Sequence, residues 1–118
     1  MGGYGVIVAS KTRTDQDCSS GSIGLAQAVA AHAYGLTLRQ LTAQPAGPAT
    51  IRPRQVAMYL ARVALRLGPR EIGRAFGRDH KAVIHACRRV EEARDDPGFD
   101  RTVEWLESFL RRAAGMPV

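Results

Sequence analysis

Apolar residues recur at helical spacing through most of the chain. In the middle of the sequence, Val56, Leu60, Val63 and Leu67 repeat every three or four residues, which is typical of the buried face of a helix. Pro53 lies where the first turn of this helix would form, a position that tolerates proline because no intrahelical N–H is needed there. The pattern therefore predicts a helix from Pro53 to Leu67.

Helical patterns also precede and follow this segment. Alanine-rich and apolar positions predict a helix from about Ile23 to Ala33, and Thr37 is expected to cap a short helix after it. Asp100 is expected to cap a last helix, in which Trp105 is expected to join the core, with a stacking platform as the alternative. The predicted apolar side of this last helix consists of Val103, Leu106, Phe109 and Leu110. Together the patterns predict an all-α fold of about six helices.

Two stretches lack a helical period. Residues 1–22 are rich in glycine, serine and threonine, and we interpret them as a flexible N-terminal arm before a single domain at residues 23–118. Residues 44–50 contain two prolines and a glycine and are expected to form a loop. This loop carries no charge.

The stretch Pro69–Arg94 combines a helix break, a cap and a basic helical face. Pro69 suits the first position of a short helix, and Gly77-Arg78 separates that helix from a second one. Asp79 suits the N-cap of the second helix. Two helices joined by a tight turn are typical of a helix-turn-helix, whose second helix enters the major groove of DNA.

Projected at about 100° per residue, this second helix has two unlike sides. Its predicted apolar side holds Val83, Ile84, Cys87 and Val90. Its opposite side holds Lys81, Ala82, His85, Arg88, Arg89 and Glu92. A recognition helix requires such an arrangement, because one side must pack on the first helix while donors near its N-terminus reach base edges.

The positive charge is concentrated in the same region. Residues 51–94 hold eleven Lys or Arg against four Asp or Glu, whereas residues 1–50 sum to +1 and residues 95–118 to −2. A local excess of this kind favours a nucleic acid as partner. The alternative is that this basic face is only solvated and binds nothing. Fifteen of the seventeen basic residues are arginine, as expected for a protein from an arginine-rich proteome.

The start of the predicted helix from Pro53 points to a phosphate. Arg52 and Arg54 lie where the helix dipole already presents partial positive charge, which is unfavourable unless an anion binds there. A DNA phosphate held by the free N–H groups, Arg54 and Gln55 would reverse the sign of this interaction.

Four motifs in this order carry a family resemblance: Arg52-Pro53-Arg54-Gln55, Glu71-Ile72-Gly73, Ala75-Phe76-Gly77-Arg78-Asp79-His80 and His85-Ala86-Cys87-Arg88. They resemble the signature of the C-terminal DNA-binding domain of DnaA, the bacterial chromosomal replication initiator. The resemblance extends more weakly over roughly residues 26–112. It implies a Trp-repressor-like helix-turn-helix fold.

The resemblance also implies which residues contact DNA. Base-edge or near-base roles fall to Asp79, His80, Lys81, Ala82 and His85. Phosphate roles fall to Arg54, Gln55, Pro69 and Arg70. Arg78 in the turn, and Arg88, which projects toward the groove, complete the expected DNA-binding set. For Asp79, a role as a simple helix cap is an equally weighted alternative.

The chain departs from the family pattern at three places. The turn is one residue shorter, and Lys81 and Ala82 stand where the family has two threonines. The uncharged loop at residues 44–50 also lacks the arginine that in the family enters the minor groove. We therefore expect a changed base preference, with guanine favoured under Lys81.

The residues needed for several other chemistries are missing from the sequence. Neither Lys11 nor Lys81 can complete a GxxxxGK[ST] phosphate loop, so we expect no nucleotide, no cofactor and no enzymatic activity. His80 and His85 lie about 140° apart on one helix, and Cys87 faces the core, which argues against a metal site.

The sequence also bears on where the protein resides. The two cysteines indicate a reducing compartment rather than a disulfide framework. No apolar run approaches ~18 residues, so neither secretion nor a membrane span is expected. We expect a cytoplasmic, nucleoid-associated protein.

The leading interpretation is a stand-alone DnaA-like domain that binds duplex DNA with a sequence preference. It would take part in, or regulate, the initiation of DNA replication or transcription, with replication proteins as further candidate partners. The alternative is a protein-interaction module of the replication or regulatory machinery that kept the fold and lost specific DNA reading. That alternative predicts weak DNA binding without sequence preference.

Overall fold

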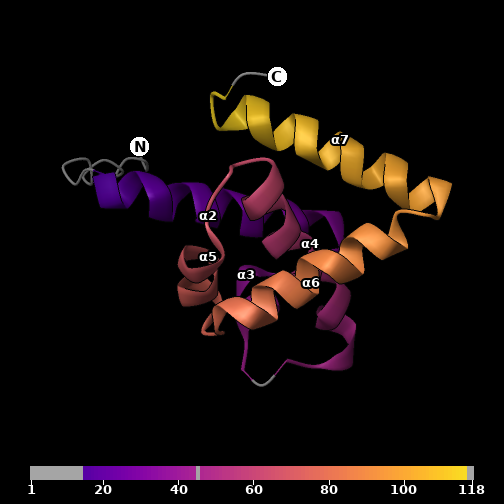
Figure 1. Ribbon diagram of the computed structural model, residues 1–118, viewed down its shortest axis with the longest axis horizontal. Coiled ribbons are helices and arrows are strands. Elements are labelled where there is room, and N and C mark those ends of the chain that lie inside the picture. The colour runs from indigo at the N-terminus through magenta and orange to yellow at the C-terminus, as the bar shows by residue number, and fades with distance from the viewer. Residues whose placement is uncertain (1–14, 45, 117–118) are drawn as a thin grey trace.

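The computed structural model describes residues 15–44 and 46–116. This part of the chain contains six α-helices, one turn of 3-10 helix and no strand, which confirms the all-α prediction (Figure 1). The elements in chain order are α2 (Asp15–Ala33), α3 (Leu38–Thr42), η3 (Pro48–Thr50), α4 (Ile51–Val63), α5 (Pro69–Phe76), α6 (His80–Ala93) and α7 (Pro97–Ala113). None of these helices is long and apolar enough to cross a membrane.

The helix α4 forms the centre of the core. Val56 and Leu60 are fully buried on it, and α4 packs against α2, α5, α6 and α7. Both α2 and α4 bury alanines, including Ala30 and Ala57, and these small side chains let the two helix axes approach closely. The arrangement leaves α5 and α6 anchored on one rigid helix.

The helix α2 begins at Asp15, which corrects the predicted start near Ile23. The sequence between these residues contains three serines and a glycine, whose low helix propensity suggested a flexible arm. A helix that is already nucleated, however, gains one hydrogen bond for each residue added. Residues 15–22 of the expected arm are therefore helical, and residues 1–14 lie outside the described part of the chain.

The helix α4 spans Ile51–Val63, shifted from the predicted Pro53–Leu67. The chain leaves the helix through Arg66, which has a left-handed backbone with φ of 61°. Leu67 still packs against the core although it lies beyond the helix end. The spacing of buried apolar residues therefore extends beyond the end of α4, which is why the predicted end at Leu67 was too late.

The helix α7 is capped by Asp96 and not by Asp100 as predicted. The Asp96 carboxylate accepts a hydrogen bond from the N–H of Phe99 at 2.8 Å, and Pro97 occupies the first turn. The earlier start is favoured because proline at the first helical position forfeits no hydrogen bond.

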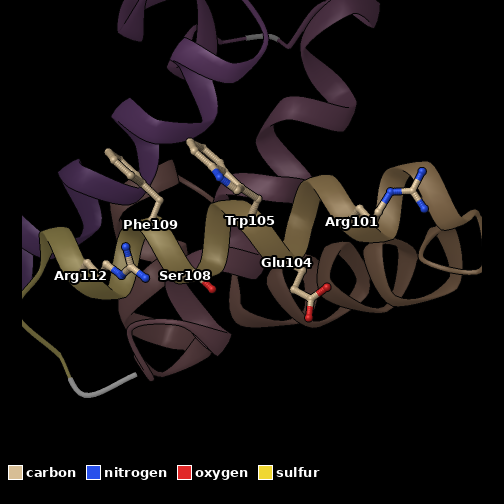
Figure 2. A pocket seen from close by; sticks show the side chains of 6 residues that line it. All are labelled: Arg101, Glu104, Trp105, Ser108, Phe109 and Arg112. Atoms are coloured by element: carbon tan, nitrogen blue, oxygen red, sulfur yellow. The ribbon is translucent and has the colours of Figure 1, made fainter.

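The exposed side of α7 carries two aromatic residues that were predicted to be buried. Val103, Leu106 and Leu110 are buried as expected, whereas Trp105 is 64% and Phe109 47% exposed. The helix packs against α2 and α4 through Val103, Leu106 and Leu110, so the side that carries Trp105 and Phe109 faces solvent (Figure 2). The predictions of core roles for Trp105 and Phe109 were wrong.

A partly buried ionic network connects the end of α6 to α7. Arg94 donates hydrogen bonds to Asp100, to Glu107 at 3.0 Å and to the Tyr59 hydroxyl at 2.9 Å. Burial works against the charged guanidinium, but these hydrogen bonds outweigh it and raise the pKa of Arg94 above its ordinary value. Asp100 therefore acts as an ion-pair partner rather than as a cap.

Candidate nucleic-acid interface

The turn between α5 and α6 is built on two glycines. Gly77 ends α5 in the left-handed region with φ of 68°, and the N–H of Arg78 donates to the Gly73 carbonyl at 2.8 Å. A Cβ on Gly73 would lie only 2.4 Å from the Arg78 carbonyl oxygen. The predicted break at Gly77-Arg78 is confirmed, and the absence of a side chain at Gly73 sets how closely the turn packs on α5.

The helix α6 begins with the predicted cap. The Asp79 carboxylate accepts a hydrogen bond from the N–H of Ala82 at 3.0 Å. This backbone hydrogen bond lowers the pKa of Asp79 below its ordinary value. The capping role is thus confirmed, and a base contact by Asp79 stays a prediction.

The two sides of α6 agree with the projection except at one residue. The buried residues are Val83, Ala86, Cys87 and Val90. Ile84 was predicted to belong to them, but it is 40% exposed, and Ala86 takes its place. Lys81, His85 and Arg88 are exposed on the opposite side, and Ala82 is half-buried.

The first half of α6 borders a pocket of about 210 Å³. Its lining comes from α6, the turn before it, the N-terminal half of α4 and the loop before η3, and consists of Ala46, Ile51, Arg54, Gln55, Met58, Arg78, Ala82, His85 and Ala86. Five members of the predicted DNA-binding set therefore meet at one place, namely Arg54, Gln55, Arg78, Ala82 and His85.

Arg54 is the buried member of this group. It is 4% exposed, and its Nη1 donates to the Ala43 carbonyl oxygen at 2.6 Å, while its Nη2 has no hydrogen-bond partner among the described residues. Burial, and then the nearby charge of Arg78, lower the pKa of Arg54. A buried donor without an acceptor is costly. An anion in the pocket would relieve the repulsion between Arg54 and Arg78.

The rest of the predicted set does not line the pocket. His80 and Lys81 occupy the first turn of α6, and Arg88 follows about two turns later, some 10 Å farther along the helix. Pro69 and Arg70 begin α5, about 12 Å along that helix from the turn. Pro69 and Arg70 therefore lie at the other end of α5 from the turn that borders the pocket.

Two residues that shape this region were not among the predicted site residues. The Gln44 side chain donates from Nε2 to the Phe76 carbonyl at 3.0 Å, which satisfies an otherwise free carbonyl at the end of α5. No local sequence signal marks this contact, since it joins residues 32 positions apart. Ala43 supplies the carbonyl that holds Arg54.

Arg52 does not join the pocket. Its guanidinium lies over the Phe99 ring, 5.4 Å from the ring centroid, so it connects α4 to α7. Cys87 is buried as predicted, and burial raises the pKa of its thiol to about 11, which keeps it unreactive. Within the described residues, no group of three His, Cys, Asp or Glu side chains is placed to hold a metal ion.

The region that contains the pocket matches a known protein family. Residues 24–90 match the family described as the bacterial dnaA protein helix-turn-helix. The chromosomal replication initiator protein DnaA of Symbiobacterium thermophilum is 39% identical over 87 residues, covering 72% of this chain and 19% of the relative. That of Gluconobacter oxydans is 43% identical over 79 residues, covering 65% and 16%. A crystal structure of a DNA replication initiation factor superposes with a TM-score of 0.76 at 29% identity, covering 84% of this chain and 31% of that one.

Proposed function

Because the chain belongs to the bacterial DnaA helix-turn-helix family, we propose that it binds duplex DNA, with α6 in the major groove. The chain spans less than a fifth of the two DnaA relatives described above, at 19% and 16% of their lengths. The activities of those longer proteins are therefore not carried over as a whole. What is proposed is the DNA-binding step alone, without nucleotide and without catalysis.

The pocket beside α6 is the observation that carries this proposal. Arg54, Gln55 and Arg78 meet beside the N-terminal half of α4, where the helix dipole also favours an anion. A phosphate of the DNA backbone in the pocket would lie beside Arg54 and offset the repulsion between Arg54 and Arg78. A phosphate held there sets the position of the duplex relative to α6.

The first turn of α6 then determines the base preference. Lys81 is exposed and carries an ammonium group whose natural partner in the major groove is the O6/N7 edge of guanine. Ala82 offers only a methyl group, which can touch a thymine methyl. His80 and His85 complete the set of side chains proposed to reach the bases.

Family membership supports a role in replication initiation, either as a participant or as a regulator, with replication proteins as further partners. A protein that binds chromosomal DNA in this way is expected in the bacterial cytoplasm with the nucleoid. Transcriptional regulation would use the same DNA-binding step.

A salt titration of duplex binding tests the proposal. If about 5–6 phosphates are neutralised, affinity falls about 10³-fold between ~50 and ~200 mM salt without any added nucleotide. Arg78→Ala, on the exposed rim of the pocket, should weaken all duplexes about equally and make the log–log slope shallower by about one.

Arg62→Ala is the matched control, because Arg62 is equally charged and exposed but lies in the last turn of α4, away from the pocket. It should leave the slope nearly unchanged. Arg54→Ala is less informative, since it also removes a buried side chain and its hydrogen bond to Ala43. A slope near zero, or equal losses for Arg78→Ala and Arg62→Ala, would contradict the proposed interface.

A further inference from the structure

The loop that follows α3 touches both α4 and the end of α5, beside the pocket. On the α4 side, the Ala43 carbonyl oxygen accepts a hydrogen bond from Arg54 Nη1 at 2.6 Å. On the α5 side, Gln44 Nε2 donates a hydrogen bond to the Phe76 carbonyl oxygen at 3.0 Å, which places this loop beside the turn between α5 and α6 (Figure 1). Ala46, two residues later, lines the pocket itself. One short segment therefore connects α4 to the end of α5.

The Gln44 amide lies against the backbone of the turn. Phe76 is the last residue of α5, and Gly77 follows it in the left-handed region. A Cβ on Gly77 would lie 3.7 Å from Gln44 Nε2, which is an ordinary van der Waals distance. The next residues are Arg78, which lines the pocket, and Asp79, which caps α6. The hydrogen bond from Gln44 therefore holds the chain two residues before Arg78 and three residues before the cap.

Packing does little to fix this stretch, since no side chain from residue 77 to residue 82 is buried. Its position depends on the groups that hold its backbone. The N–H of Arg78 donates to the Gly73 carbonyl oxygen, which ties the turn to α5 alone. The hydrogen bond from Gln44 comes instead from the loop that Arg54 holds, so it relates the start of α6 to α4.

We propose that Gln44 is a positioning residue for DNA recognition, which sets the start of α6 relative to the phosphate-binding side of α4. The inference rests on the proposed function, in which Arg54 and Gln55 lie at a phosphate and Lys81 at a base. Base reading needs donors and acceptors about 2.7–3.2 Å apart, so a displacement of ~0.5 Å already weakens it. A charged side chain attracts a phosphate over a longer range. The loss of the Gln44 donor should therefore weaken specific binding more than non-specific binding.

Gln44→Met tests the proposal, because methionine keeps the length and neutrality of the side chain and removes the donor. A duplex selected by the parent from random DNA is compared with a scrambled duplex of the same length. The affinity of the variant for the selected duplex should fall about three- to tenfold, the usual effect of one hydrogen bond. Its affinity for the scrambled duplex should stay within about twofold of the parent's, with the same salt dependence because no charge is lost.

Gln27→Met is the matched control. It makes the same chemical change on α2, where the glutamine makes no hydrogen bond within the described residues. It should leave both affinities unchanged. Urea unfolding of the three proteins checks that each is folded under the binding conditions. A merely structural role of Gln44 would lower the unfolding midpoint and leave the ratio of the two affinities as it is in the parent.

Selection from random duplexes, repeated with Gln44→Met, separates positioning from direct contact. Positioning predicts the same preferred sequence with a weaker preference at every position that α6 reads. A changed base at a single position would show that the Gln44 amide itself reads that base, and equal losses for both duplexes would place the amide at a phosphate. Either result overturns the proposal, as does a variant that binds both duplexes like the parent. A parent that binds no duplex, or prefers none, contradicts the proposed function as well, so the two failures can be told apart.

Discussion

At the scale of single residues, Gly73 controls the approach of α5 to the turn. Gly73→Ala would place a Cβ 2.4 Å from the Arg78 carbonyl oxygen, so the backbone of the turn must move. We expect a loss of about 1–3 kcal/mol in the free energy of unfolding, together with weaker DNA binding. Gly24→Ala is the control, because its Cβ would have no neighbour within 4 Å and alanine favours a helix by ~0.5–1 kcal/mol. Equal denaturation midpoints for the parent and Gly73→Ala would contradict the role of Gly73.

At the scale of elements, the joint between α6 and α7 depends on Arg94. Arg94→Met would leave Glu107, whose side chain is 11% exposed, without its guanidinium partner. We expect a loss of about 3 kcal/mol, the lower end for a broken buried ion pair because Arg94 keeps some contact with water. Adding Glu107→Gln should restore part of this loss, as measured by urea unfolding. A single variant within ~0.5 kcal/mol of the parent would show that the network adds no stability.

The same scale shows which elements could be predicted from the sequence. Local signals were reliable where one residue forms the cap or break by itself, as with Pro69, Gly77 and Asp79. The cap of α7 was assigned to Asp100, although Pro97 favours a start after Asp96, and Asp100 instead forms an ion pair with Arg94. The exposure of Trp105 could not be predicted, since it depends on which side of α7 meets α2 and α4.

At the scale of the whole molecule, the sequence singled out five of the residues that line the pocket, but it did not predict the burial of Arg54. The motifs gave the residues that meet at the pocket, whereas the burial of Arg54 depends on Ala43, eleven positions away, and on the packing around it. The helices packed around α4 include α6, whose basic side is exposed, and α7, whose two aromatic rings are exposed.

Selection of bound sequences from random duplex DNA tests the central claim most directly, because the claim is that α6 reads bases. The parent should enrich one motif with guanine at the position under Lys81. The Lys81→Thr, Ala82→Thr variant should lose that guanine and keep the positions under His80 and His85, with a change in preference of about ten- to a hundredfold for contacts worth ~1–3 kcal/mol each. No enriched motif for the parent, or the same motif for both proteins, would contradict base reading by α6.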